Sequence, residues 1–261
     1  MNWWQALILG LVQGLTEFLP VSSSGHLVIF RELLGVEAPS DLAFEITVHV
    51  ATVLATIVVF RKQILDLLQG LFKFKYNKQT DYIAKLVVSM IPVAIVGVLF
   101  KDKVEEMFNS LPVVGCALLV TALLLFLSDK AKAKEGGEIT FGRALIMGLG
   151  QAVAVVPGLS RSGTTISAGL LSGASRNKVA EFSFLMVLVP ILGEAFLDLV
   201  GGDLAASTVS AAPLLIGFLA AFISGLFACK AMIALVKKAG LKWFALYCAI
   251  VGLAVLVCSL V

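Results

Sequence analysis

Apolar runs of the length that spans a bilayer constrain this chain more than any other feature of its sequence. A transmembrane helix needs about 20 predominantly apolar residues, and six stretches of roughly 17 to 25 residues meet that requirement. Of the 261 residues, 59% are hydrophobic and only 14% are charged, against about 25% charged residues in an average soluble domain. No soluble fold of this length could bury so much apolar surface. The expected spans are 43–60, 84–100, 112–128, 182–200, 212–233 and 242–260.

Two further apolar stretches, 3–35 and 143–173, are each interrupted in the middle by Pro, Gly and Ser. The interruptions fall at 20–25 and 157–163. Irregular backbone at membrane depth persists only where protein buries it or where it lines a wet cavity. We therefore expect each stretch to form a re-entrant hairpin that enters and leaves through the same face of the membrane.

The two interrupted stretches resemble each other, which indicates an internal duplication. Residues 8–13 align with 146–151 at an offset of 138 residues, and the same offset pairs Ser22 with Ser160. Each half would hold one hairpin and three spans, and because three is odd the second half must be inverted relative to the first, as in many transporters. We therefore predict an all-α polytopic membrane protein, a single domain over 1–261 built from inverted repeats at 1–128 and 143–261.

The distribution of basic residues predicts the orientation, whereas the net charge of +3 is too small to indicate a nucleic-acid partner. Most of the 20 lysines and arginines fall in alternate loops, and the intervening loops hold only Lys101 and Lys103. By the positive-inside rule the basic loops are cytoplasmic, so both termini should lie outside. The first hairpin then enters from outside and the second from the cytoplasm. The basic loops are 61–85, 129–143, 174–181 and 234–242.

The first hairpin carries polar groups that an apolar segment would not keep without a reason. Gln13 and Glu17 are four residues apart and share one helix face. An ionised carboxylate at bilayer depth costs at least about 2.5 kcal/mol, so it needs a cation or a donor cluster. A serine can cap the helix that restarts after the break, but three serines and a histidine exceed that need. Together with the carboxylate they suit an activated nucleophile; they are Ser22, Ser23, Ser24 and His26.

The second hairpin loop favours an anion. Its helix should begin near Ser160, and the free N–H groups and dipole at a helix N-terminus attract negative charge. Arg161 adds a forked donor suited to phosphate oxygens. The alternative is an ion pair between Arg161 and Glu17 that holds the two hairpins together. The candidate anion ligands are Ser160, Arg161, Ser162, Gly163, Thr164 and Thr165.

Placed at one point by the inverted repeat, the two loops would join an acidic, nucleophilic half to an anion-binding half. A carboxylate beside a phosphate needs a divalent cation, and oxygen ligands such as Glu17 and Gln13 suit Mg²⁺ or Ca²⁺. The expected chemistry is phosphoryl transfer to water from a lipid-borne phosphate, with a lipid-phosphate transporter and a structural partner of other enzymes as alternatives. Glu45 and His49, also four residues apart, we expect to make helix contacts.

The motifs at 13–26 and 157–165, with a shorter one at 181–185, resemble the undecaprenyl-diphosphate phosphatases, or bacitracin-resistance proteins of the BacA type. The similarity runs from about residue 3 to 260. The resemblance implies hydrolysis of undecaprenyl diphosphate to undecaprenyl phosphate and phosphate, at a site open to the outer face of a bacterial plasma membrane. The lipid carrier would return to peptidoglycan synthesis, and bacitracin would be better tolerated. A homodimer is compatible with the sequence.

The resemblance also implies roles for the site residues. Glu17 would bind metal or act as a base with help from Gln13, which can coordinate only as a neutral ligand. Ser23 would be the nucleophile, with Ser22 and Ser24 as neighbours, and His26 would accept the proton or protonate the leaving group. Whether Ser23 forms a phospho-enzyme or positions a water molecule stays open. Arg161 would hold the phosphates with Ser160, Ser162 and Thr165.

Overall fold

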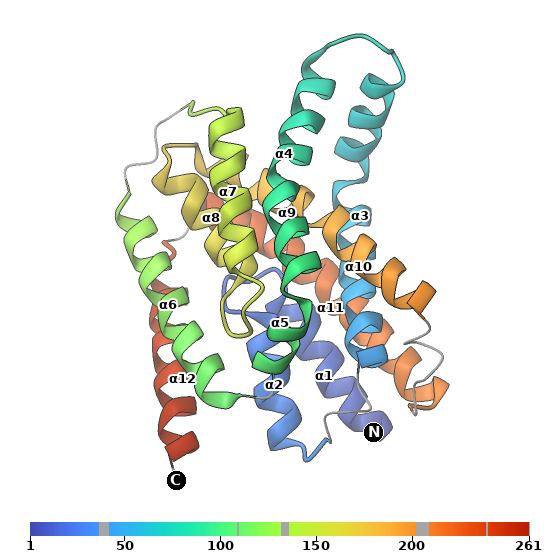
Figure 1. The fold of residues 1–261 in the computed structure, drawn as a ribbon, viewed down its shortest axis with the longest axis vertical. Coiled ribbons are helices and arrows are strands. Elements are labelled where there is room, and N and C mark those ends of the chain that lie inside the picture. Colours follow the sequence, from blue (N-terminus) through green and yellow to red (C-terminus); the bar gives the residue numbers. More distant parts are fainter. Residues whose placement is uncertain (37–41, 109, 132–135, 202–208, 239, 261) are drawn as a thin grey trace.

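A computed structural model describes residues 1–36, 42–108, 110–131, 136–201, 209–238 and 240–260, and all regular structure within these ranges is helical (Figure 1). The helices stand side by side as a bundle whose long axis is vertical in Figure 1. They are α1 (Trp3–Thr16), α2 (Ser23–Leu33), α3 (Leu42–Leu71), α4 (Lys78–Leu99), α5 (Lys101–Met107), α6 (Leu111–Lys130), α7 (Phe141–Val153), α8 (Arg161–Leu171), α9 (Arg176–Met186), α10 (Leu188–Gly201), α11 (Ala211–Lys238) and α12 (Lys242–Leu260).

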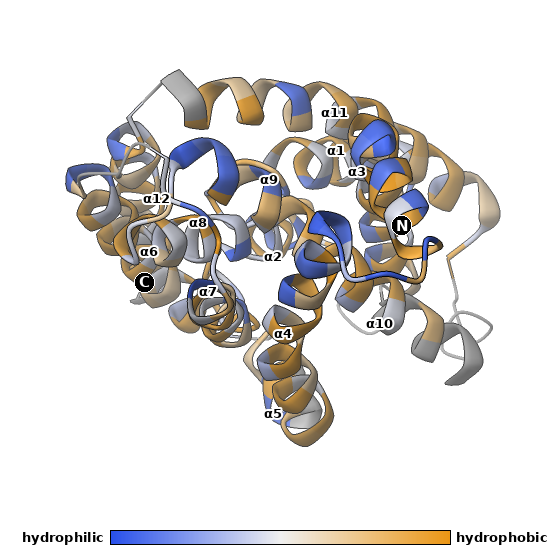
Figure 2. Ribbon diagram, turned by 90° about the horizontal axis from the view of Figure 1, so that it is seen from above, coloured by the Kyte–Doolittle hydropathy of each residue, from blue (hydrophilic) through white to orange (hydrophobic). Residues whose placement is uncertain are grey.

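Within the described ranges, five helices are long and apolar enough to cross a membrane: α3, α4, α6, α11 and α12. Their outer faces carry large apolar side chains that water would not tolerate in such density; Leu123, Phe227 and Ile250 are each more than half exposed. The helix sides in Figure 2 are predominantly hydrophobic. The bilayer is therefore the solvent for these faces, and the chain is an all-helical, multi-pass membrane protein.

The expected span at 182–200 is wrong as a single helix, because the chain breaks at Val187 into α9 and α10. Pro190 has no N–H, and its ring would clash with the carbonyl of Met186 in a continuous helix. The new helix starts with the N–H of Ile191 donating to the carbonyl of Val187 at 3.2 Å. With 11 and 14 residues, neither piece reaches the length that a membrane span requires.

Each interrupted stretch forms two helices joined by an irregular loop, α1–α2 in the first and α7–α8 in the second. Both loops contain backbone that a helix excludes, since φ is 71° at Ser22 and 91° at Gly158. Figure 1 shows α1–α2 extending from the end that holds both termini and α7–α8 from the opposite end, with their loops turned toward each other.

The two loops meet at close contact near the centre of the molecule. Ser162 Oγ donates to the carbonyl of Leu19 at 3.2 Å. A Cβ added to Gly25 would lie 2.9 Å from Gly158 Cα, so only glycines allow this approach. The tip-to-tip meeting of the two hairpins expected from the sequence is therefore present.

The basic loops are gathered at one end of the bundle. Asp129, at the end of α6, accepts from the N–H of Leu241 at 2.6 Å and lies 3.9 Å from Arg176. Arg143 Nε donates to the carbonyl of Ser172 at 3.1 Å. These contacts join the α6–α7, α8–α9 and α11–α12 connections, while both termini lie at the opposite end (Figure 1).

Gly158→Ala tests the close packing of the second loop against α6. Alanine at φ 91° is strained, and its Cβ would come 2.8 Å from Val114 Cα. We expect the free energy of unfolding to fall by at least about 2 kcal/mol, seen as a lower thermal midpoint in detergent. The matched control is Gly142→Ala in α7, where a Cβ meets no atom within 4 Å and helix propensity improves. Equal midpoints for the two variants would contradict the packing argument.

Candidate active site

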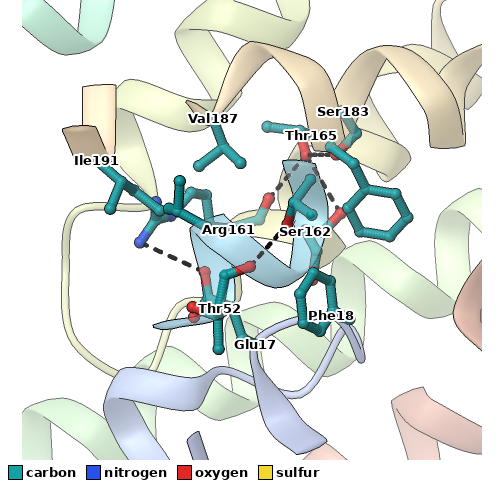
Figure 3. Close-up of a pocket in the computed structure, with 12 residues that line it drawn as sticks. Glu17, Phe18, Thr52, Arg161, Ser162, Thr165, Ser183, Val187 and Ile191 are labelled. Carbon is teal, nitrogen blue, oxygen red and sulfur yellow. Dashed lines mark hydrogen bonds and ion pairs between the residues drawn. The ribbon is translucent and has the colours of Figure 1, made fainter. Parts of the chain in front are cut away.

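A pocket lies where the hairpin loops meet α3, α9 and α10 (Figure 3). Glu17 and Arg161 face each other across it, one from the end of α1 and the other from the start of α8. Its hydroxyl groups come from α3 and α9 as well as from α8. The remaining lining residues are Phe18, Thr52, Val53, Thr56, Ser162, Thr165, Ser183, Phe184, Val187 and Ile191.

Glu17 is the acidic group of the pocket, and its side chain is only 9% exposed. Its N–H still donates to the carbonyl of Gln13, so it stands at the last turn of α1. The carboxylate Oε2 accepts from Ser23 Oγ at 2.5 Å and from Gln13 Nε2 at 3.0 Å. Two donors therefore hold this oxygen, and the hydroxyl proton of Ser23 already points at a base.

Arg161 approaches the same carboxylate without being fixed by it. Its Nη2 lies 3.9 Å from Glu17 Oε1, beyond hydrogen-bond distance. Within the described part of the chain its guanidinium donates no hydrogen bond, and the side chain is 29% exposed. A structural ion pair would use the fork of donors at short range. This geometry leaves the donors free and favours the anion-binding alternative.

The helices α2 and α8 begin with the same capping arrangement, α8 at the pocket and α2 beside Glu17. Ser22 Oγ accepts from the N–H of Gly25 at 3.2 Å, and Ser160 Oγ accepts from the N–H of Gly163 at 3.1 Å. In each case the capping hydroxyl also contacts the hydroxyl of the serine two residues later. Ser22 Oγ lies 3.3 Å from Ser24 Oγ, and Ser160 Oγ lies 3.4 Å from Ser162 Oγ. Two converging helix N-termini provide partial positive charge for an anion.

The two threonines of the second motif have different surroundings. Thr165 lines the pocket, and its hydroxyl lies 2.6 Å from that of Ser183 and donates to the carbonyl of Arg161 at 2.8 Å. Thr164 is buried outside the pocket lining, and its hydroxyl has no partner within the described residues. Only Thr165 is therefore placed to face a ligand.

His26 is not brought to Ser23 or Glu17. Its Nδ1 lies 2.7 Å from the carbonyl of Ser22, and its Nε2 lies 2.7 Å from the hydroxyl of Tyr247. Both ring nitrogens are thus engaged on the side of the loop that faces α12. The proximity of His26 to Ser23 in sequence does not translate into contact.

His49, which we expected from the sequence only to make helix contacts, is the imidazole beside the carboxylate. Its Nε2 lies 3.9 Å from Glu17 Oε2, while its Nδ1 lies 2.8 Å from the carbonyl of Glu45. The expected helix contact is present for Glu45, which pairs with Arg31 of α2. A usable signal existed, since His49 begins a polar series with Thr52 and Thr56 at spacings that keep one helix face.

The oxygens of Glu17 and Gln13 could supply some, but not all, of the ligands of a hard cation. Across the described residues no cluster of three histidine, cysteine, aspartate or glutamate side chains could hold a metal, so Glu17 is the single carboxylate available. Gln13 Oε1 is buried and has no partner in the same part of the chain. Those two oxygens suit Mg²⁺ or Ca²⁺ if phosphate oxygens and water supply the remaining ligands.

Comparison with known families decides what kind of protein carries this pocket. The family described as "Bacitracin resistance protein BacA" matches residues 6–254. The chain belongs to this family. The matched range includes both hairpin loops, α9 and every helix that lines the pocket.

Individual relatives extend the similarity over the full chain. Undecaprenyl-diphosphatase of Parabacteroides distasonis is 56% identical over 264 residues, covering 100% of this chain and 99% of that protein. The protein of the same name from Bacteroides fragilis is 54% identical over 263 residues, with 99% of each covered. That of Methanobrevibacter smithii is 41% identical over 273 residues, covering 98% of this chain and 97% of its own.

Arg161→Gln separates the two interpretations of the guanidinium. If Arg161 binds an anion, its contact with Glu17, at 3.9 Å and beyond hydrogen-bond distance, contributes little to stability. The thermal midpoint of the variant should then stay close to that of the unmodified protein. We expect inorganic pyrophosphate to raise the midpoint of the unmodified protein but not that of Arg161→Gln. If the thermal midpoint of Arg161→Gln instead fell as far as that of Gly158→Ala, and pyrophosphate still raised it, Arg161 would be a structural partner of Glu17.

Proposed function

We propose that the protein hydrolyses undecaprenyl diphosphate to undecaprenyl phosphate and inorganic phosphate. This activity recycles the lipid carrier for peptidoglycan synthesis and raises tolerance to bacitracin. The observation that carries the proposal is the hydroxyl of Ser23, 2.5 Å from the buried carboxylate of Glu17. This carboxylate faces Arg161, whose guanidinium donates no hydrogen bond to the described residues. The names of the full-length relatives agree with it.

In the proposed binding step the diphosphate head enters the pocket between the two hairpin loops. Arg161 and the N-terminus of α8 hold the terminal phosphate, with Ser160, Ser162, Gly163 and Thr165 around it. The charge that spreads over the phosphate oxygens in the transition state meets these donors in a partly desolvated site, where they act most strongly. Thr164, whose hydroxyl has no partner among the described residues and lies outside the pocket lining, is assigned no contact with the phosphate.

In the proposed chemical step Ser23 Oγ attacks the terminal phosphorus and passes its proton to Glu17 Oε2. The bond between the terminal phosphorus and the bridging oxygen breaks, and undecaprenyl phosphate leaves with the electron pair. Glu17 then releases the proton to solvent and takes one from a water molecule that attacks the phosphoserine. Phosphate departs, and Ser23 recovers its proton from Glu17. In the alternative route Ser23 only positions the water that attacks the diphosphate directly.

We propose that Glu17 and Gln13 hold a divalent cation, Mg²⁺ or Ca²⁺, together with the substrate. Such an ion neutralises charge between a carboxylate and a diphosphate. The support for it is Gln13, whose Nε2 donates to Glu17 while its buried Oε1 has no partner among the described residues.

The proposed topology is an inverted repeat of two re-entrant hairpins. Gly10 of α1 packs against Gly217 of α11, and Gly148, its counterpart at the 138-residue offset, packs against Ser89 of α4. The first helix of each hairpin thus packs against a long helix of the other half, as expected for a two-fold repeat. The basic end of the bundle would face the cytoplasm, so that both termini lie outside and the site opens toward the outer face of a bacterial plasma membrane.

Release of phosphate from undecaprenyl diphosphate by the purified protein in detergent tests the activity. We expect Glu17→Gln and Arg161→Gln each to lose at least about a hundredfold in rate, as when a donor to the transition state is deleted. Ser172→Ala is a matched control, since that hydroxyl donates only to the carbonyl of Gly169 at the far end of α8. No turnover under any condition would sink the hydrolase proposal and favour a polyprenyl-phosphate transporter.

Ser23→Ala decides between the two chemical routes. A covalent phosphoserine predicts a loss at least as large as that of Glu17→Gln, together with a phosphorylated Ser23 trapped in the unmodified protein by acid quench. A rate near that of the Ser172→Ala control would contradict nucleophilic attack by Ser23 and leave the direct attack of water.

Chelation tests the proposed cation. We expect EDTA to abolish turnover and Mg²⁺ or Ca²⁺ to restore it, because the carboxylate and the diphosphate repel each other without a cation between them. Gln13→Leu, which removes the neutral ligand, should raise the cation concentration needed for half-maximal rate. Robust turnover in chelator would remove the metal from the proposal.

A further inference from the structure

We propose that Tyr247, on α12, is a positioning residue that acts through His26 to hold the loop segment bearing Ser23. The inference rests on the proposed function, since it assigns a role within that same site. Tyr247 belongs to the second half of the chain, 221 residues from His26 in sequence, and no motif of the pocket includes it.

The hydrogen bonds of His26 fix which nitrogen carries the proton. Its Nδ1 lies 2.7 Å from the carbonyl oxygen of Ser22, and a carbonyl can only accept. Nδ1 is therefore protonated, and in the neutral ring Nε2 accepts from the hydroxyl of Tyr247 at 2.7 Å. The two rings are also stacked, with centroids 5.6 Å apart and planes 10° from parallel. The carbonyl of Ser22 thus sets the tautomer of His26, and Tyr247 holds the orientation of the ring through its hydrogen bond and its stacked face.

The peptide that His26 holds is strained. Ser22 has φ 71° and ψ 95°, a conformation that a residue with a Cβ adopts rarely and that persists only when its surroundings enforce it. The carbonyl of Ser22 is held by the ring and by the N–H of His26 at 3.1 Å, and its hydroxyl by the N–H of Gly25. Ser23 follows directly, so the direction of its hydroxyl toward Glu17 depends on this peptide.

A second contact from α12 reaches the same loop. Cys248 Sγ lies 3.7 Å from the carbonyl of Pro20, two residues before the strained serine. Two neighbouring residues of α12 therefore contact the chain before Val21, at Pro20, and after it, at His26 of α2. Tyr247 is 43% exposed on the outer side of the bundle, whereas His26 is 2% exposed. The tyrosine closes the polar loop from the outside without itself reaching the pocket.

Tyr247→Phe tests the role, because it removes the hydroxyl and keeps the stacked ring. We expect kcat to fall about three- to tenfold, the effect of one lost hydrogen bond, with KM within twofold of the unmodified protein. The matched control is Tyr82→Phe in α4, whose hydroxyl is buried without a partner in the described residues; it should leave kcat unchanged. Unchanged kcat in Tyr247→Phe would overturn the proposal.

A measurement independent of turnover is the ¹⁵N spectrum of the imidazole in detergent. The chain has two histidines, so His49→Gln assigns the signals. Neutral His26 should have its proton on Nδ1, and Tyr247→Phe should shift the Nε2 resonance while Tyr82→Phe does not. A proton on Nε2 of His26, or an Nε2 resonance that Tyr247→Phe does not shift, would contradict the hydrogen bond between the two residues. Because this readout needs no substrate, it stands even if the hydrolase proposal fails.

His26→Asn separates positioning from proton transfer. The asparagine amide can still donate to the carbonyl of Ser22 but cannot titrate. We expect a loss of about tenfold, the same limbs in the pH–rate profile, and no further loss when Tyr247→Phe is added, because the pair acts as one unit. A loss beyond about a hundredfold with one limb of the profile missing would make His26 a proton-transfer group and overturn the positioning role.

Discussion

Irregular backbone inside an apolar bundle must find its hydrogen bonds within the protein, and the fold of this chain is organised around that requirement. The loop of the second hairpin is held by Thr121 of α6, which accepts from the N–H of Ser160 at 2.9 Å and donates to the carbonyl of Gly158 at 3.3 Å. Across the contact, Ser162 satisfies the carbonyl of Leu19. Each loop is thus stabilised by helices of the other half.

Much of the fold and part of the site could be predicted from the sequence. Proline, glycine and serine in apolar runs located both hairpin loops, and the need of Glu17 for a partner predicted its approach to Arg161. The break at Val187 was missed, because hydropathy gives no weight to a single proline in a long apolar run. Its signal was Pro190, whose missing N–H ends the preceding helix.

The two histidines show where sequence proximity misleads. His26 is three residues from Ser23, but its ring turns back to a carbonyl four residues earlier, on the other side of the loop. His49 is 32 positions from Glu17 and reaches the carboxylate only because α3 packs against the first hairpin. Such a contact depends on tertiary packing, and neither hydropathy nor motif spacing encodes it. The polar face of α3 was the available clue, and it became meaningful only beside Glu17.

The distance in sequence between the two walls of the pocket has a consequence for biosynthesis. Glu17 and Arg161 come from opposite halves of the chain, and at ribosomal speed the arginine is synthesised roughly 7 to 30 seconds after the glutamate. Under the proposed function, a nascent or truncated chain that stops before α8 would lack the proposed phosphate-binding residues. Unfinished copies in the membrane would then not compete for the lipid carrier.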